Sequence, residues 1–129
     1  MPDLSVKKPR PVWFNLSPLN LPLPGLVSIL HRVSGLLLVA GLVWALFLLE
    51  MSLASADGFA RFKMYVAHPL VKLALLGYLW AYLHHFCAGI RYLFLDIHKG
   101  IDLPAARKTS YAVLAVSLGM TVILGARLW

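Results

Sequence analysis

Two clusters of polar side chains interrupt otherwise apolar segments of this 129-residue chain, and they are its candidate sites for chemistry. The first cluster is spaced i, i+3, i+4 and i+7, which places its members on one helix face: Ser28, His31, Arg32 and Gly35. Arg32 would lie about 9 Å inside a membrane helix, where a charge costs a few kcal/mol without a partner or a wet cavity. A snorkelling anchor is the alternative, but the neighbouring His31 and Ser28 favour a binding site.

The second cluster follows one stripe of a later helix and contains Tyr78, His85, Gly89, Tyr92 and Asp96. A neutral imidazole in mid-membrane is a good ligand for iron, and Gly89 leaves space for a flat ring to lie close. His84 points about 100° away from His85 and is expected to face another neighbour. Spacing alone leaves two interpretations of His85 equally open, an iron ligand and a structural hydrogen-bonding histidine.

The composition indicates that the elements carrying these clusters are membrane helices. Hydrophobic residues make up 60% of the chain and charged residues 13%, and a soluble core of this length could not bury so much apolar surface. The net charge of +7 does not indicate nucleic-acid binding, because most Lys and Arg residues flank hydrophobic runs. The one cysteine, Cys87, lies in an apolar run and is interpreted as a packing residue.

We expect an all-α membrane protein with three transmembrane helices in a single transmembrane domain over residues 1–129. The apolar runs predict spans at about residues 26–50, 69–95 and 110–129, each long enough to cross about 30 Å of hydrocarbon. Residues 1–24 are polar and then proline-rich, which predicts an interfacial arm without a long helix. Residues 51–68 and 96–109 are predicted to be short connections.

The distribution of basic residues predicts a cytoplasmic N-terminus. The N-terminal arm and the second connection, with its edge, hold Lys7, Lys8, Arg10, Arg91, Lys99, Arg107 and Lys108. The opposite side holds Arg61, Lys63 and Arg127. The polar, basic start of the chain resembles neither a signal peptide nor an import leader, which favours a bacterial inner membrane, with a processed mitochondrial form as the alternative.

Taken together and in order, the two clusters resemble a known family. Ser28-Ile-Leu-His-Arg-Val-Ser-Gly35, followed by His85-x-x-x-Gly89-Ile-Arg91-Tyr-Leu-x-x-Asp96, is similar to the cytochrome b subunit of succinate dehydrogenase, the larger membrane anchor of respiratory complex II. The resemblance covers nearly the whole chain, including the basic arm at residues 7–11 and the three-span layout.

The resemblance implies one haem b shared with a second, smaller anchor subunit, with one axial histidine from each. In this chain the implied iron ligand is His85, not His84. The implied quinone-binding residues are Ser28 and Arg32, and the implied partners of the haem propionates are His31 and Arg32. The family usually has histidine where this chain has Tyr92, which puts any role of position 92 in doubt. Arg91 and Asp96 are expected to be structural or supporting residues.

The resemblance therefore predicts a membrane-anchor subunit of succinate:ubiquinone oxidoreductase that holds an iron–sulfur subunit and a flavoprotein subunit on the membrane. The chain has no flavin motif and no cysteine cluster, so we expect it to be inactive alone. Three alternatives stay open: the anchor of a fumarate reductase, a haem-free structural anchor, and a self-contained cytochrome with His31 and His85 as intrachain ligands.

Overall fold

A computed structural model describes residues 21–129, and this part of the chain folds into four helices with no strand. They are α1 (Leu23–Ala54), α2 (Ala56–Ala67), α3 (Pro69–Asp96) and α4 (Leu103–Leu128). Three of them, α1, α3 and α4, are long and apolar enough to cross a membrane. The expected all-α membrane protein with three spans is confirmed. Of the arm predicted at residues 1–24, residues 1–20 lie outside the described residues, and the orientation stays a prediction.

Proline marks the start of every spanning helix. Pro24, Pro69 and Pro104 all stand at the first or second helical position, where the missing N–H costs no hydrogen bond. The start of α4 is also capped by Asp102, whose carboxylate accepts a hydrogen bond from the Ala105 N–H at 3.1 Å. The third spanning helix, α4, begins at Leu103, seven residues before the start of the span predicted at 110–129. The difference arises because an α-helix continues past the hydrocarbon into the polar interface.

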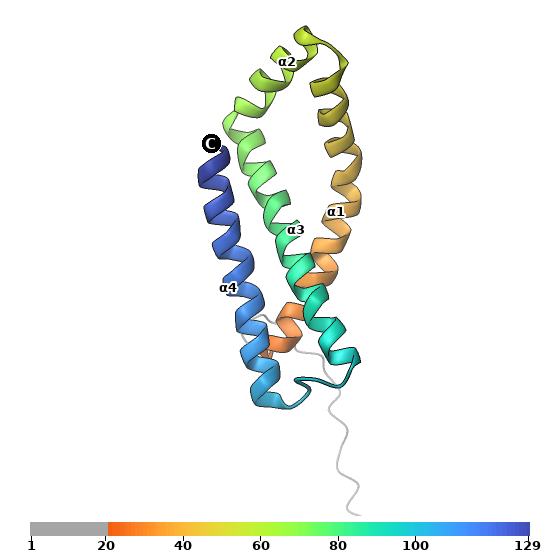
Figure 1. Cartoon of the computed structure of the whole chain (residues 1–129), viewed down its shortest axis with the longest axis vertical. Helices are drawn as coiled ribbons and strands as arrows, with labels where there is room; N and C mark the ends of the chain where they lie inside the picture. The colour runs from red at the N-terminus through yellow and green to blue at the C-terminus, as the bar shows by residue number, and fades with distance from the viewer. Residues whose placement is uncertain (1–20) are drawn as a thin grey trace, which may run out of the picture.

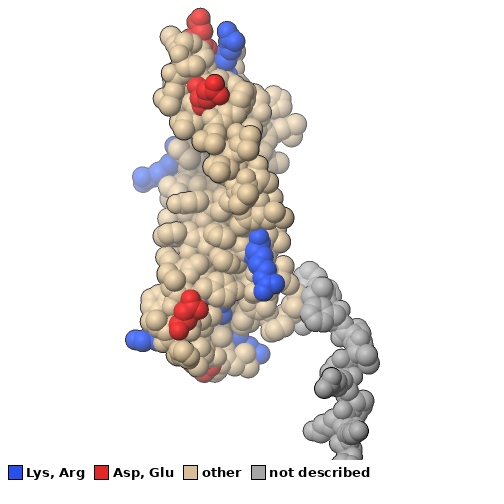
Figure 2. All heavy atoms as spheres, turned by 90° about the vertical axis from the view of Figure 1, so that its right-hand side faces the viewer, with Lys and Arg blue, Asp and Glu red and all other residues tan. Residues whose placement is uncertain are grey.

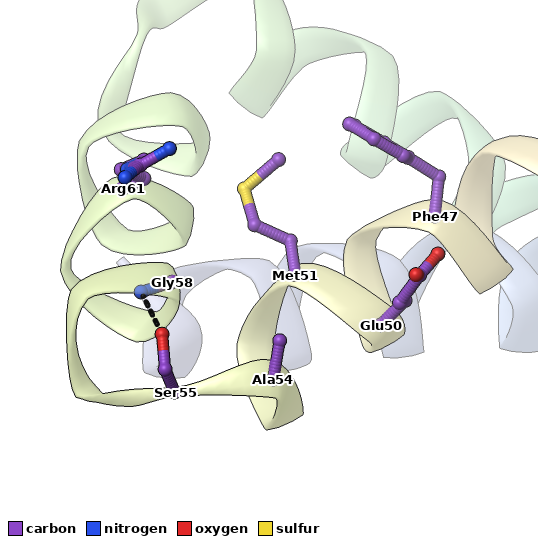
Figure 3. A pocket seen from close by; sticks show the side chains of 7 residues that line it. All are labelled: Phe47, Glu50, Met51, Ala54, Ser55, Gly58 and Arg61. Atoms are coloured by element: carbon purple, nitrogen blue, oxygen red, sulfur yellow. Dashed lines mark hydrogen bonds between the residues drawn. The ribbon is translucent and has the colours of Figure 1, made fainter.

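The first connection differs most from its prediction, because most of residues 51–68 form the 12-residue helix α2. Ser55 begins it by accepting the Gly58 N–H at 2.9 Å (Figure 3). The Phe59 and Phe62 rings stack at 6.0 Å, and the Lys63 ammonium lies 5.1 Å from the Phe59 ring centre. No residue of α2 is buried, as suits an amphipathic helix that lies at the membrane surface.

The corner between α1 and α2 is tight. A Cβ atom on Gly58 would lie 2.7 Å from the carbonyl oxygen of Met51, so only glycine fits there without a shift of the backbone. A hollow of about 380 Å³ opens beside this corner, with Glu50 and Arg61 among its lining residues (Figure 3). In Figure 1, α2 caps the gap between the upper ends of α1 and α3, whereas the lower ends of these helices cross.

The three spanning helices pack through small residues and leave most apolar side chains exposed. Their common core contains Val27 of α1, Ala88 of α3 and Val113 of α4. Figure 2 shows charged side chains mainly toward the two ends, with a largely uncharged band between them. Side chains such as Val43, which is 75% exposed, therefore need lipid or a partner subunit to cover them.

Candidate functional site

A pair of histidine rings joins α1 to α3 at the crossing of these helices. The imidazoles of His31 and His85 are stacked, with ring centres 4.1 Å apart and planes 15° from parallel. His85 Nδ1 lies 3.0 Å from the backbone carbonyl oxygen of His31 and 3.3 Å from Ser34 Oγ. The buried Ser34 hydroxyl itself donates to the same carbonyl at 2.9 Å. Two residues of one turn of α1, His31 and Ser34, thus hold the His85 ring.

This contact assigns the tautomer of His85. A carbonyl oxygen can only accept a hydrogen bond, so the His85 proton belongs on Nδ1. The lone pair then lies on Nε2, which has no hydrogen-bond partner among residues 21–129 and is available as a metal ligand. His85 is only partly buried, so this nitrogen is not enclosed by the bundle.

Gly35 makes the approach of the two helices possible. A Cβ atom at this position would lie 2.8 Å from His85 Cε1 and 3.2 Å from its Nδ1, distances that would displace the ring. Gly35 was predicted to share the face of the first cluster. Its close contact with an imidazole of another helix was not predicted. The contact of Ser34 with the His85 ring was also missed. Both residues are small and stand three and four positions after His31, and this spacing could have predicted a close helix contact there.

The stripe predicted on α3 faces α1 along much of its length. The Tyr78 hydroxyl donates to the carbonyl of Leu38 at 3.1 Å, and its ring lies against Gly41, where a Cβ atom would clash with it. The Tyr92 ring centre lies 5.1 Å from that of His31. Asp96, the last member of the stripe, is exposed.

Gly89 does leave open space, and the nearest ring in that space belongs to the same chain. A Cβ atom added at Gly89 would lie 3.9 Å from His31 Nε2, an ordinary van der Waals contact. His31 is partly buried, and His85, Gly89 and Tyr92 lie beside it on the α3 side.

Ser28 and Arg32 extend the His31 face of α1, but the structure does not bring them to His85. Ser28 is partly buried and Arg32 is exposed. Among residues 21–129, no carboxylate forms an ion pair with the Arg32 guanidinium, although the helix holds it within a spanning segment. The guanidinium of Arg32 therefore needs an anionic group or water that comes from outside the described part of the chain.

His84 has a different environment from His85, as the helical spacing predicted. Its side chain is fully buried and stacks on Trp80, with ring centres 5.2 Å apart. Neither ring nitrogen has a hydrogen-bond partner among the described residues. No group outside the bundle can reach His84 without a rearrangement of the helices.

Arg91 joins α3 to α4. Its side chain is 7% exposed, and its Nε donates to Thr109 Oγ1 at 3.1 Å. This contact fits the expectation that Arg91 is a structural residue.

The histidine pair is not a ready-made site for two axial ligands of one iron. Bis-histidine ligation places the two coordinating nitrogens on opposite sides of the metal, so the rings lie end to end. The rings of His31 and His85 lie face to face at 4.1 Å, which leaves no room for a porphyrin between them. Within residues 21–129, no group of three or more metal-binding side chains occurs either. The stacked geometry therefore argues against the self-contained cytochrome with His31 and His85 as intrachain ligands.

Fold and site together define a polytopic membrane protein that presents one imidazole nitrogen near the crossing of two spanning helices. Comparison with known families gives the next step: residues 6–124 match the succinate dehydrogenase/fumarate reductase transmembrane subunit family, and the chain belongs to that family.

Individual relatives agree with this assignment. The chain is 35% identical over 114 residues to the succinate dehydrogenase cytochrome b556 subunit of Paracoccus denitrificans, covering 88% of each chain. It is 34% identical over 121 residues to the protein of the same name from Coxiella burnetii, covering 93% of this chain and 97% of the relative.

Proposed function

We propose that this chain is the cytochrome b membrane anchor of a succinate:ubiquinone oxidoreductase in a bacterial inner membrane. The family includes the anchors of both succinate dehydrogenase and fumarate reductase, and the names of the two relatives support succinate dehydrogenase. The partners would be a second membrane anchor, an iron–sulfur subunit and a flavoprotein subunit. The single observation that carries the haem assignment is the contact between His85 Nδ1 and the His31 carbonyl.

Haem b, when bound, would supply a one-electron centre close to the quinone. The function of His85 would be to present the Nε2 lone pair as one axial ligand. The His31 carbonyl and Ser34 hold the ring in that tautomer and orientation, as hydrogen bonds to the second nitrogen do in other histidine sites. Because His31 lies face to face with His85, the second axial ligand would come from the smaller anchor.

Arg32 and Ser28 would serve the quinone and the propionates. An exposed guanidinium inside a spanning helix offsets the negative charge of a propionate, and of a quinone as it is reduced, in a site with little water. Ser28 lies one turn before Arg32 on the same face, and its hydroxyl would donate to a quinone carbonyl oxygen. His31, between them along the chain, would approach the propionates together with Arg32.

The test is the optical spectrum of the detergent-purified complex with substitutions at the two adjacent histidines. We expect His85→Ala to lose or strongly alter the low-spin b-type absorption bands. His84→Phe keeps a ring of similar size in the buried position and should retain them. Equal effects of both substitutions would contradict the assignment of His85, and a wild-type complex without b-type haem would favour a purely structural anchor.

A further inference from the structure

A second polar feature lies on the other side of α3 from the histidine pair, where α3 ends and α4 begins. A hollow of about 200 Å³ opens there, several times the ~30 Å³ that one water molecule occupies. Its lining combines two basic side chains, one hydroxyl and an apolar wall: Arg91, Lys99, Thr109, Ile90, Phe94 and Leu95. No acidic side chain lines it.

Arg91 is the buried charge of this hollow. Its side chain is 93% buried, and in the described part of the chain it forms no ion pair with a carboxylate. Its Nε donates to Thr109 Oγ1, and that hydroxyl donates onward to the Ala106 carbonyl at 3.2 Å. Thr109 thus binds the Nε edge of the guanidinium, whose central carbon also lies 5.7 Å from the Tyr92 ring centre. The two terminal amino groups donate no hydrogen bond to a described residue and can serve another acceptor.

The loop after α3 brings a second cation to the same place. His98 and Gly100 both have positive φ, 59° and 75°, which turns the chain back on the helix end. The Lys99 N–H donates to the Phe94 carbonyl at 2.9 Å, which closes this turn. Lys99 therefore lies beside the last turn of α3 and adds its charge to that of Arg91.

We propose that this hollow binds the phosphate group of an anionic phospholipid. A buried guanidinium without a carboxylate is costly in a membrane helix, and a phosphate can accept two parallel hydrogen bonds from it. The apolar wall of Ile90, Phe94 and Leu95 suits the glycerol and acyl part of a lipid and not a free inorganic ion. Basic pockets between spanning helices at the membrane boundary are typical sites for anionic headgroups. The site does not depend on haem.

The experiment measures lipid selectivity of the purified complex in phosphatidylcholine bilayers, with trace spin-labelled phosphatidylglycerol or spin-labelled phosphatidylcholine. We expect the wild-type complex to bind phosphatidylglycerol preferentially. Lys99→Gln should weaken this binding about fivefold, the usual contribution of one cation near a membrane surface, and Arg91→Gln should weaken it further. Arg107→Gln is the matched control, since it removes an exposed charge of α4 that does not line the hollow.

Two further arms keep the assignment falsifiable. Arg91→Lys retains the charge and should retain part of the lipid selectivity. If Arg91→Gln fails to assemble, Lys99→Gln alone tests whether the hollow binds anionic lipid. Excess inorganic phosphate at constant ionic strength should not displace the labelled lipid. Full displacement would assign the site to a soluble phosphate and overturn the lipid. Equal effects of Lys99→Gln and Arg107→Gln, or no lipid preference in the wild type, would overturn the site itself.

Discussion

Two sides of α3 carry histidines that are adjacent in sequence and lie in different environments. The histidine-pair side, with Tyr78, His85 and Tyr92, faces α1. The Nδ1 atom of His85 is hydrogen-bonded there, and its Nε2 atom has no hydrogen-bond partner among residues 21–129. The core side, with His84 and Arg91, is buried in the bundle and joins α3 to α4.

The difference shows that neither the depth of a histidine in a membrane helix nor its neighbours in the sequence determine which groups its ring nitrogens contact. His84 is more deeply buried than His85, yet neither of its ring nitrogens forms a hydrogen bond with a described residue. His85 has a backbone carbonyl that fixes its tautomer and a glycine that makes room for its ring. The neighbouring helix α1 therefore supplies both the carbonyl beside Nδ1 and, at Gly35, the space for the His85 ring.

The largest expected effect comes from filling the space beneath His85. Gly35→Ala places a Cβ atom 2.8 Å from His85 Cε1, and overpacking of this kind costs about 1–3 kcal/mol or displaces the ring. We expect most of the low-spin haem signal of the purified complex to be lost or shifted. Gly77→Ala on α3 is the matched control, because a Cβ atom there would meet nothing within 4 Å. An unchanged spectrum for Gly35→Ala would show that the space at Gly35 is not needed to hold the His85 ring.

Arg32→Ala tests the charge on the open face of α1. Loss of a charge-assisted hydrogen bond of about 1.5–3 kcal/mol predicts roughly tenfold to hundredfold slower quinone reduction. Succinate oxidation with a soluble dye should persist, because the flavoprotein subunit is untouched. Arg107→Ala, a change of the same type on the surface of α4, should leave both rates unaltered. Unchanged quinone kinetics in Arg32→Ala would count against the quinone assignment.

Ser28→Ala should have a smaller effect on the same reaction. A neutral hydrogen bond contributes about 0.5–1.5 kcal/mol, so we expect the KM for quinone to rise roughly threefold to tenfold with little change in kcat. Ser52→Ala, on the same helix, removes a hydroxyl that bonds only to the Leu49 carbonyl within its own turn and should change nothing. An unaltered apparent affinity would exclude Ser28 from the quinone pocket.

The smallest effect is expected on the core side of α3. Thr109→Val removes the acceptor of the Arg91 Nε proton. It should lower the free energy of unfolding by about 1 kcal/mol, measured as a lower thermal midpoint of the purified complex. The haem spectrum should be unchanged, since Thr109 lies on α4 and does not contact the histidine pair. A spectral change as large as that of Gly35→Ala would show that the two sides of α3 are not independent.

Helix α2 was not predicted from the sequence, for an identifiable physical reason. Residues 51–68 are too short and too polar to span a membrane, so a search for spans interprets them as a connection. Their helical signals are local: a capping Ser55 and aromatic residues at 59, 62 and 65. A surface helix needs only one apolar face, and this face was visible in the sequence.

The sequence by itself determined the three spans and the two polar clusters on them. Apolar length and proline position act within one helix, and the spacing of Ser28, His31 and Arg32 follows from the helical repeat alone. Only the tertiary structure decided that the His31 carbonyl, Ser34 and Gly35 hold His85, and that Arg91 binds Thr109. These contacts depend on where α1, α3 and α4 cross and at what register. That crossing is set by close packing between helices, which no single helix encodes.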